Sequence, residues 1–368
     1  MSVEFHPLTV IDISPETDDA VSVTVAIPPE LRERFRHRPG QHVVIRAELD
    51  GVDVRRSYSI CDPPGGDTLR VGIKRIPGGV FSTYATTGLA AGDVLQVMAP
   101  IGDFVTEPGS GTPRTLVMIA AGSGITPVLA MVAAALRDEP STSVIVVYGN
   151  RTTRSIMFHE DLEALKNRYP TRLQVLHVLS REPNRVPLFE GRIDGERLEL
   201  LCRTLIDPGT VDGWFLCGPL DMVETLTATL ERIGVPGGRV HSELFFDQRI
   251  ETVPAASGDD AAAASDGGHR VEVTFTLDGR TSTVAVDPGG PPLLDHARTV
   301  RTEVPFACKG GMCATCRAVL SEGTVVMAKN YALTAEEIAA GHILTCQAHP
   351  TGDGPVTFSY DIHATVQR

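Results

Sequence analysis

The pattern of apolar and polar positions divides the chain into regions with different periods. In the first hundred residues, residues 21–25 and 69–73 alternate apolar with polar positions, and residues 43–45 form a short apolar run. Turn-forming dipeptides such as Pro39-Gly40 separate these stretches. Several short strands at this spacing predict a small antiparallel β-barrel.

The period changes after Pro113, where apolar runs begin to alternate with helical stretches. The runs cover residues 115–120, 144–148, 173–179 and 213–216, and helices are expected at residues 125–136, in a segment ending near residue 168, and at residues 222–233. Strands that alternate with helices predict right-handed βαβ crossovers and a parallel sheet, with ligands at the carboxyl ends of the strands.

The last part of the chain begins with a biased segment. Residues 255–268 contain Ala, Ser, Asp and Gly in low-complexity order, which predicts a flexible tether. Beyond it, residues 271–275 and 282–286 flank Asp278-Gly279, a hairpin signal. With a helix expected at residues 293–300 and a last strand at residues 356–358, this region predicts a compact α+β unit. The expected limits are 1–110 for the barrel, 111–250 for the α/β domain, 251–269 for a linker and 270–368 for the α+β domain.

Composition narrows the functional class. The chain is 42% hydrophobic and 21% charged, as expected for globular domains, and it lacks an apolar run of about 18 residues that would span a membrane. Its 46 acidic and 33 basic residues give a net charge of −13, which argues against general nucleic-acid binding. The start of the chain does not resemble a signal peptide, and Cys61, Cys202 and Cys217 are scattered, so we expect reduced thiols and a cytoplasmic location.

The strongest chemical signal is a group of cysteines near the carboxyl end. Cys308, Cys313 and Cys316 lie within nine residues, and Cys346 follows at a distance. The C-x4-C-x2-C spacing with a later fourth cysteine is the plant-type ligand pattern for a [2Fe-2S] cluster. A disulfide framework is typical of small secreted domains, and structural zinc usually uses two short knuckles, whereas only Cys313 and Cys316 form one here. The intervening glycines also allow backbone N–H groups to turn toward the sulfurs.

Two segments of the barrel region have the chemistry of a flavin nucleotide site. The first is Arg56-Ser57-Tyr58-Ser59, and the second is Gly79-Val80-Phe81-Ser82 at an expected helix start. An arginine and a glycine-rich helix N-terminus suit phosphates, and a tyrosine ring suits a flat ligand. Each segment taken alone is a weak signal, and an Arg-x-Tyr-Ser segment alone is more often an ordinary strand.

Two further segments end predicted strands of the α/β domain. Gly122-Ser123-Gly124-Ile125-Thr126-Pro127 lies between a strand and a helix, where it can bind a pyrophosphate, although Pro127 replaces the third glycine of the full dinucleotide motif. Cys217-Gly218-Pro219 ends another strand at the same edge. Cys217 has no dedicated His and Asp partners in the sequence, so its thiol is expected to be buried or to line a nicotinamide pocket rather than to act as a nucleophile.

Together, these segments and the four cysteines resemble the ferredoxin-NADP reductase superfamily, in the branch with a plant-type ferredoxin domain at the carboxyl end. Within that branch the chain is similar to the reductases of phenylacetyl-CoA epoxygenase and 3-ketosteroid 9α-hydroxylase systems. The resemblance covers nearly the whole chain in the expected order. It implies a multidomain protein with a flavin-binding antiparallel β-barrel, a nicotinamide-binding α/β domain with a parallel sheet, and a β-grasp ferredoxin domain.

The resemblance also implies roles for individual residues. It places Ser59, Cys217 and Glu243 at the catalytic centre, and Cys308, Cys313, Cys316 and Cys346 on the cluster. The implied FAD contacts are Arg56, Ser57, Tyr58, Ser59, Ile73, Lys74, Gly79, Val80, Phe81 and Ser82, with Phe245 as the aromatic that shields the flavin ring. The implied nicotinamide dinucleotide contacts are Gly122, Gly124, Ile125, Thr126, Ser180, Arg181, Cys217, Gly218 and Pro219.

The choice of nucleotides follows from the same resemblance. Ser180-Arg181 matches the pair that receives the 2′-phosphate in NADPH-dependent relatives, and Arg151 or Arg185 can add positive charge. We therefore expect NADPH rather than NADH, and FAD rather than FMN.

These parts predict an electron-transfer enzyme. A nicotinamide gives two electrons as hydride, an iron–sulfur cluster accepts one at a time, and a flavin can do both, so electrons should pass from NAD(P)H through FAD and the [2Fe-2S] cluster to an external oxygenase. The phenylacetyl-CoA epoxygenase type of system is favoured over a steroid or aromatic-ring hydroxylase. The alternatives from other classes are a redox-sensing iron–sulfur flavoprotein without turnover and a zinc-stabilised binding module.

Overall fold

The computed structural model describes residues 4–106, 109, 111–245, 270–352 and 354–361. They form two compact units, of which the larger contains the barrel and the parallel sheet and the smaller is centred on the carboxyl-terminal segment. The expected linker at residues 251–269, with its tether at residues 255–268, lies outside the described residues. The expected domain limits therefore stay predictions.

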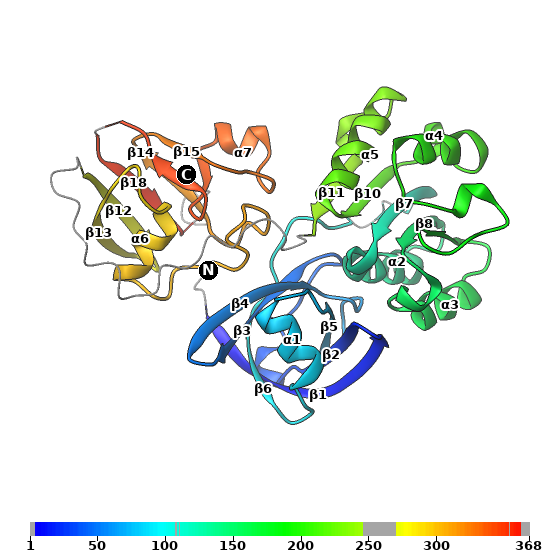
Figure 1. The fold of residues 1–368 in the computed structure, drawn as a ribbon, viewed down its shortest axis with the longest axis horizontal. Coiled ribbons are helices and arrows are strands. Elements are labelled where there is room, and N and C mark those ends of the chain that lie inside the picture. The colour runs from blue at the N-terminus through cyan, green and yellow to red at the C-terminus, as the bar shows by residue number, and fades with distance from the viewer. Residues whose placement is uncertain (1–3, 107–108, 110, 246–269, 353, 362–368) are drawn as a thin grey trace. The chain divides into compact units, whose positions relative to one another are not determined.

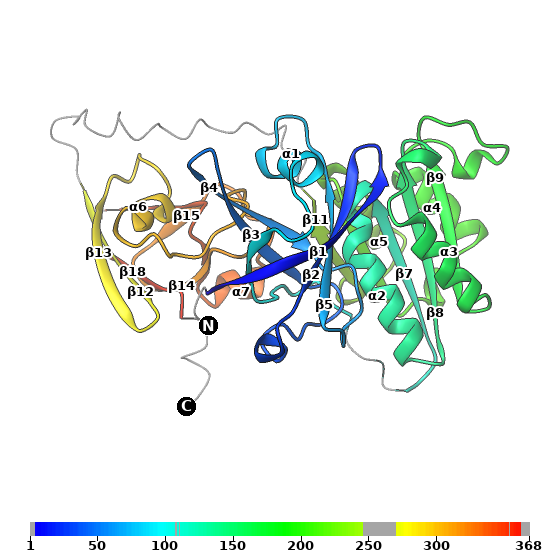
Figure 2. The ribbon, with the colours of Figure 1, turned by 90° about the horizontal axis from the view of Figure 1, so that it is seen from below.

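The first sheet is the predicted antiparallel barrel. Its six strands have the order β4-β3-β6-β1-β2-β5, and a bridge between Ile60, just after β4, and Val71 of β5 joins the two ends. In the β2–β5 pairing Val23 lies opposite Val71, and both side chains are buried, as the alternating pattern predicts. The strands are β1 (Phe5–Thr17), β2 (Ala20–Ala26), β3 (His42–Leu49), β4 (Val52–Ser59), β5 (Thr68–Lys74) and β6 (Val94–Met98), and helix α1 (Val80–Thr87) lies across one end of the barrel (Figures 1 and 2).

The second sheet is parallel throughout and has the order β11-β10-β7-β8-β9. Helices α2 and α3 cover one face and α4 and α5 the other (Figure 1), so the central strand β7 is buried on both sides. This double burial explains why its sequence is a continuous apolar run. The strands are β7 (Arg114–Ala121), β8 (Thr142–Asn150), β9 (Leu173–Leu179), β10 (Gly213–Gly218) and β11 (Val240–Leu244), and the helices are α2 (Ile125–Asp138), α3 (His159–Arg168), α4 (Gly195–Thr204) and α5 (Leu220–Arg232).

The strand order of this sheet fixes where a ligand can bind. From β7 the chain moves outward to β8 and β9, then returns to β10 on the other side of β7. The order therefore reverses between β7 and β10, and open α/β sheets bind ligands at such a switch point, outside the carboxyl ends of the strands. The segments that begin at Gly122 and Cys217 lie at these two strand ends.

The carboxyl-terminal unit is a five-stranded sheet of order β13-β12-β18-β14-β16, packed against α6, with a separate β15-β17 pair. The predicted hairpin is present: Asp278 and Gly279 have φ values of 51° and 69°, the two positive values that a type I′ turn needs. This arrangement confirms an α+β domain. Its elements are β12 (Val271–Leu277), β13 (Arg280–Val286), α6 (Leu293–Val300), β14 (Arg317–Glu322), β15 (Val325–Met327), α7 (Ala335–Ala339), β16 (His342–Leu344), β17 (Ala348–Pro350) and β18 (Val356–Ser359).

Short 3-10 helices connect several of these elements. They are η1 (Pro29–Leu31), η2 (Gly122–Gly124), η3 (Thr153–Ser155), η4 (Pro187–Phe189), η5 (Pro208–Thr210) and η6 (Gly237–Arg239). Among the described residues, no helix is both long and apolar enough to cross a bilayer.

Candidate functional site

Two predicted catalytic residues from distant parts of the chain meet where the barrel joins the parallel sheet. Ser59 is the last residue of β4, and Glu243 lies near the end of β11. The Ser59 hydroxyl donates a hydrogen bond to Glu243 Oε2 over 3.5 Å, at the long end of the usual range. Ser59 is buried and the Glu243 side chain is only 18% exposed, so both polar groups are largely removed from water.

Cys217, the third predicted catalytic residue, lies opposite Glu243 in the β10–β11 pairing. Burial raises the pKa of the Cys217 thiol, and the negative charge of Glu243 raises it further. The thiol is therefore neutral at physiological pH and a poor nucleophile. This agrees with the expectation that the Cys217 thiol is buried and is not a nucleophile, while its role in a nicotinamide pocket stays a prediction.

His42 is a buried residue of this site that was not predicted from the sequence. Its Nδ1 atom lies 3.9 Å from Glu243 Oε1, and burial lowers the pKa of His42 to about 4 although Asp103 acts in the opposite direction. Its Nε2 atom is buried and has no hydrogen-bond partner among the described residues. The only sequence signal was a polar residue immediately before the apolar run at residues 43–45.

The residues of the predicted flavin motif line one edge of the barrel along β4. The Tyr58 ring packs against the Phe81 ring, with 5.6 Å between the centroids. Arg56 is half-buried and donates from Nη1 to the carbonyl of Arg55 over 2.8 Å. The Ser57 hydroxyl is buried and lacks a hydrogen-bond partner within the described part of the chain. A buried hydroxyl without a partner is unusual, and a bound polar ligand would satisfy it.

The second flavin segment begins helix α1, whose first N–H groups lack intrahelical partners. Ser82 stabilises the preceding turn, because its hydroxyl accepts a hydrogen bond from Ile76 N over 3.1 Å and donates to Gly79 O over 3.3 Å. A Cβ atom at Gly79 would lie 2.5 Å from Ser82 Oγ and 3.1 Å from Ile76 O, so a larger residue there would displace the Ser82 hydroxyl from its bonds. Free N–H groups at a helix start fit the phosphates of a dinucleotide.

The remaining predicted flavin residues have different environments. Phe81 and Ile73 are fully buried in the barrel core, so their side chains contribute packing. Val80 is exposed. Lys74 Nζ lies 3.3 Å from Asp19 Oδ1 and is therefore already paired.

The predicted dinucleotide turn is a 3-10 turn that leads directly into α2. A Cβ atom at Gly124 would lie 2.2 Å from Cys217 O, so only glycine permits this approach to the end of β10. The Thr126 hydroxyl donates to Ser123 O and the Tyr148 hydroxyl donates to Gly122 O, each over 2.9 Å. These bonds hold the turn with the N–H groups of α2 free, as a pyrophosphate requires.

The barrel also packs closely against this turn. A Cβ atom at Gly72 of β5 would lie 2.6 Å from Thr126 Cγ2 and 2.9 Å from the Phe158 ring. Gly72 was not predicted as a site residue, because a glycine inside an alternating strand gives no sign of what approaches it. Its role here is to let the two halves of the larger unit come together.

The predicted 2′-phosphate residues lie beyond the ends of β8 and β9. Ser180 N donates to Asn150 O over 2.9 Å and Arg181 N donates to Arg151 O over 2.8 Å, which brings the two arginine-bearing loops together. Arg181 is exposed, whereas Arg151 forms an ion pair with Asp19 over 3.0 Å. The positive charge at this edge therefore comes mainly from Arg181 and the exposed Arg185.

The predicted shielding aromatic lies next to the dinucleotide site. Phe245 N donates to Gly218 O over 2.9 Å, and the half-buried ring packs against the core that contains Cys217. Pro219 precedes helix α5 as its N-cap.

The four predicted cluster cysteines come together in the carboxyl-terminal unit as two neighbouring pairs. Cys308 is next to Cys313, and Cys316 is next to Cys346. Two pairs of cysteine sulfurs match the needs of two irons, each with two protein ligands. None of the seven cysteines of the chain is in a disulfide.

Backbone and side-chain donors stabilise the thiolates of Cys308 and Cys346, whereas the paired cysteine and burial raise the pKa of Cys313 and Cys316. The hydrogen bond from Cys313, with smaller help from the N–H groups of Gly310 and Met312, lowers the pKa of Cys308 to about 6. The bond from Cys316, assisted by the N–H group of Gly311, lowers the pKa of Cys346. Metal ligation requires deprotonated sulfur, so these donors fit a bound cluster.

The loop conformation that aims these donors is set by left-handed residues. Lys309, Gly311 and Ala314 have φ values of 53°, 78° and 50°. A Cβ atom at Gly311 would lie 2.9 Å from Lys329 O, so this position requires glycine for space as well as for φ. The fourth ligand is held by Thr345, whose hydroxyl donates to Cys316 O over 3.0 Å.

Comparison with known families matches all three parts. Residues 8–106 match the oxidoreductase FAD-binding domain, residues 118–227 the oxidoreductase NAD-binding domain, and residues 275–351 the 2Fe-2S iron-sulfur cluster binding domain. These matches confirm the expected cofactor classes.

Individual relatives resemble the chain over nearly its full length. It is 41% identical to a subunit of the 1,2-phenylacetyl-CoA epoxidase of Escherichia coli, over 96% of this chain and 98% of the relative. It is 33% identical to the ferredoxin reductase component of 3-ketosteroid-9-alpha-monooxygenase of Rhodococcus rhodochrous, over 94% of each. The solved structure of phthalate dioxygenase reductase has the same fold, with a TM-score of 0.57 at 19% identity, covering 96% of this chain and 98% of that one.

Proposed function

The chain belongs to the family of oxygenase reductase components that combine FAD-binding, NAD-binding and 2Fe-2S domains, and from this premise we propose that it supplies electrons from NADPH to a phenylacetyl-CoA epoxidase type of oxygenase. The observation that carries the choice of system is the 41% identity to a component of such an epoxidase across 96% of the chain, against 33% for the ketosteroid reductase. The substrate itself would be bound by the oxygenase.

The cofactors supply the redox chemistry. Bound FAD would supply the chemistry that converts a two-electron hydride donor into a source of single electrons for the 2Fe-2S cluster. The work of the protein is to bind these groups, orient them and exclude water.

In the proposed arrangement, Arg56 and the first N–H groups of α1 hold the FAD phosphates, and Tyr58 lies against the flavin ring. The turn from Gly122 to Thr126 holds the NADPH pyrophosphate at the start of α2. Both anion sites have the same physical basis, which is unpaired N–H groups at a helix N-terminus, where the helix dipole favours negative charge.

Ser59, Cys217 and Glu243 would form the wall against which the nicotinamide meets the flavin. The Ser59 hydroxyl is oriented by its bond to Glu243 Oε2. The neutral Cys217 thiol and the buried His42 ring exclude water from this wall. Phe245 is proposed to cover the flavin until the nicotinamide enters.

In the carboxyl-terminal unit, Cys308, Cys313, Cys316 and Cys346 would hold the two irons. The Thr315 hydroxyl donates to Cys313 Sγ over 3.1 Å and Gly310 N donates to Cys308 Sγ over 3.3 Å. Such donors stabilise the more negative, reduced state and therefore raise the reduction potential of the cluster.

We also propose two finer assignments. NADPH would be preferred because the exposed Arg181, next to the loop of Arg151, would meet a 2′-phosphate bound at these strand ends. The location would be the cytoplasm, in accord with seven cysteines that form no disulfide. Fractionation of cells that express the chain tests the location, and recovery of the protein outside the cytoplasm would contradict it.

Reconstitution tests the function. The purified chain, loaded with FAD and iron–sulfur, is mixed with the catalytic subunits of a phenylacetyl-CoA epoxidase, NADPH and phenylacetyl-CoA. We expect NADPH oxidation coupled to epoxide formation. Coupled product with a ketosteroid oxygenase, and none with the epoxidase, would contradict the proposed system.

A further inference from the structure

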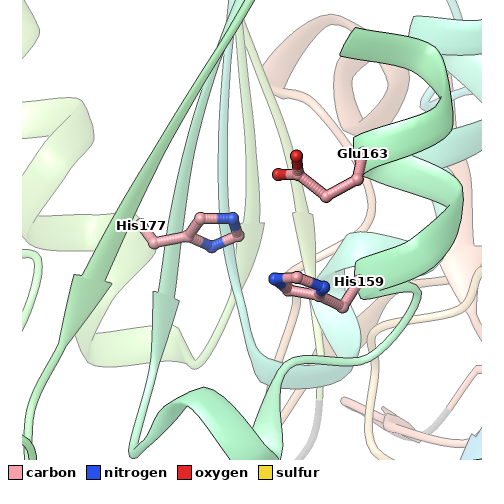
Figure 3. Close-up of side chains that lie close together, drawn as sticks. All are labelled: His159, Glu163 and His177. Carbon is pink, nitrogen blue, oxygen red and sulfur yellow. The ribbon is translucent and has the colours of Figure 1, made fainter. Parts of the chain in front are cut away.

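A group of three metal-ligating side chains lies outside all the sites described above. His159 and Glu163 project from helix α3, and His177 projects toward them from strand β9 (Figure 3). One potential ligand atom from each residue lies within 4.8 Å of the other two. Neither the flavin, the nucleotide nor the iron–sulfur chemistry uses these residues.

The fold explains why they meet. His159 and Glu163 are four residues apart on α3, so they lie on the same face of the helix. That helix packs against β9, the edge strand of the parallel sheet. His177 lies opposite Tyr148 of the neighbouring strand, with 5.9 Å between the ring centroids, and its ring is stacked with that of His159 at 5.8 Å.

The environment of His177 favours a bound ligand. Both of its ring nitrogens are buried, and neither has a hydrogen-bond partner in the portion of the chain that the structure describes. Buried polar nitrogens are nearly always satisfied in proteins, since leaving one unpaired costs free energy. A metal ion or an ordered water would satisfy one of these nitrogens. The neighbouring His159 and Glu163 favour the metal ion, because their side chains are also metal ligands.

The ligand set indicates which metal. Two imidazole nitrogens and one carboxylate oxygen are typical of Zn²⁺, which takes such ligands at about 2.0–2.2 Å and leaves a fourth tetrahedral position for water. Tetrahedral ligand atoms at these lengths lie roughly 3.4 Å apart. Atoms now up to 4.8 Å apart need to approach by only ~1.4 Å. His159 is exposed and free to turn toward the other two residues.

One interaction opposes the ion. Lys166 Nζ lies 3.1 Å from Glu163 Oε1 and 3.3 Å from Oε2. Both side chains are about two-fifths exposed, at 38% and 40%, so this ion pair is weak and its lysine can swing into solvent. The carboxylate is therefore available to a divalent cation.

We propose that His159, Glu163 and His177 bind Zn²⁺ and that the ion fastens α3 to the edge strand β9. The same helix carries contacts to the barrel, because Asp161 pairs with Arg70 over 3.1 Å and Phe158 N donates to Glu16 over 2.9 Å. A bound ion would thus rigidify the helix through which the barrel and the α/β domain are joined.

Metal titration of the holoprotein tests the proposal. Zn²⁺ is added to the protein with FAD and iron–sulfur in place, in competition with a chromophoric chelator, while the cluster absorbance shows that iron is retained. We expect one Zn²⁺ per wild-type chain. Removing an outer-shell partner of a metal site costs about 10–100-fold in affinity, so loss of a direct ligand in His177→Gln or His159→Gln should cost at least as much.

A variant with the opposite effect separates ligation from misfolding. Lys166→Gln frees Glu163 from its ion pair, and the loss of an exposed pair of this kind should tighten Zn²⁺ binding by up to about fivefold. Glu160→Gln, which removes an exposed charge from the same helix one residue from His159, should leave the affinity unchanged. NADPH reduction of the flavin, which these residues do not contact, confirms that each variant is folded.

Three results would overturn the proposal. They are the absence of Zn²⁺ binding to the wild type at tens of micromolar metal, unchanged affinity in both histidine variants, and an equal loss of affinity in Glu160→Gln. The first result would indicate that an ordered water, and not a metal ion, binds the His177 nitrogens. The third would show that the affinity for Zn²⁺ depends only on the overall charge of α3.

Discussion

Ser59 Oγ lies 3.5 Å from Glu243 Oε2, although the two residues are 184 positions apart in the sequence. Ser59 ends a strand of the barrel and Glu243 lies on the edge strand β11 of the parallel sheet, so neither domain alone contains the pair. A flavin held by the barrel and a nicotinamide held by the sheet would meet at this point. A hydride-transfer site at this pair would thus depend on how the two domains pack.

Replacing the hydroxyl of this pair should slow hydride transfer. We expect Ser59→Ala to reduce the rate of flavin reduction by NADPH about 10²-fold, because small losses of alignment between reacting groups have effects of this size. Anaerobic stopped-flow absorbance of the flavin measures the rate. Ser22→Ala, which alters another buried serine of the barrel, is the matched control. Equal rates in the two variants would show that Ser59 has no special role.

The close approach at Gly124 makes a separate prediction. A methyl group there would lie 2.2 Å from Cys217 O, so Gly124→Ala must push the dinucleotide turn away from β10. We expect a loss of stability of at least about 1–3 kcal/mol, as for other overpacked sites, together with weaker NADPH binding. Thermal unfolding and the KM for NADPH measure both effects. Gly237→Ala, where a Cβ atom would meet open space, should change neither, and a Gly124→Ala variant with the same behaviour would contradict the described packing.

Nucleotide preference depends on Arg181. Hydrogen bonds between charged groups contribute about 1.5–3 kcal/mol, so Arg181→Gln should lower kcat/KM for NADPH roughly 10–100-fold and leave the value for NADH nearly unchanged. Arg203→Gln, at the carboxyl end of α4 and hence near the opposite edge of the sheet, controls for loss of general positive charge. A parallel decrease for both nucleotides would exclude Arg181 as the 2′-phosphate ligand.

His42 predicts sensitivity to acid. Burial lowers its pKa from 6.5 to about 4, so the folded protein binds this proton less readily than the unfolded chain does. Above about pH 6.5, His42 has no effect on the free energy of unfolding. As the pH decreases from 6.5 toward 4, this free energy falls, and at pH 5 His42 lowers it by about 2 kcal/mol. Urea unfolding at pH 7 and pH 5 measures the difference, which should shrink in His42→Gln. An unchanged difference would assign the acid sensitivity to other groups.

The sequence predicted the elements whose pattern has a simple physical cause. The strand at residues 173–179 and the helix at residues 293–300 have the predicted bounds, since each is a single apolar run or amphipathic turn between clear breakers. Helix α4 was not predicted, because half of its residues are polar and its apolar residues form no extended run. Its start is marked only by Asp194, whose carboxylate accepts a hydrogen bond from Arg197 N.

The candidate sites divide in the same way. The cysteine loop was recognisable because its ligands are nearly contiguous and their spacing is specific. Gly72 and His42 were not, because their importance arises from contacts with residues far along the chain, Thr126 for the first and Glu243 for the second. The cluster of His159, Glu163 and His177 was missed for the same reason, since a strand and a helix must pack together before the three residues meet.

The central claim is that electrons leave the protein through the cysteine loop after reduction of the flavin. Anaerobic stopped-flow spectroscopy of Cys313→Ser with NADPH and the partner oxygenase tests it most directly, with Cys202→Ser as a control for loss of a thiol outside the loop. We predict that the flavin of Cys313→Ser is bleached at nearly the wild-type rate while electron delivery to the oxygenase is abolished. If both activities fell together in a folded variant, or if delivery persisted, the loop would not be the exit of the pathway.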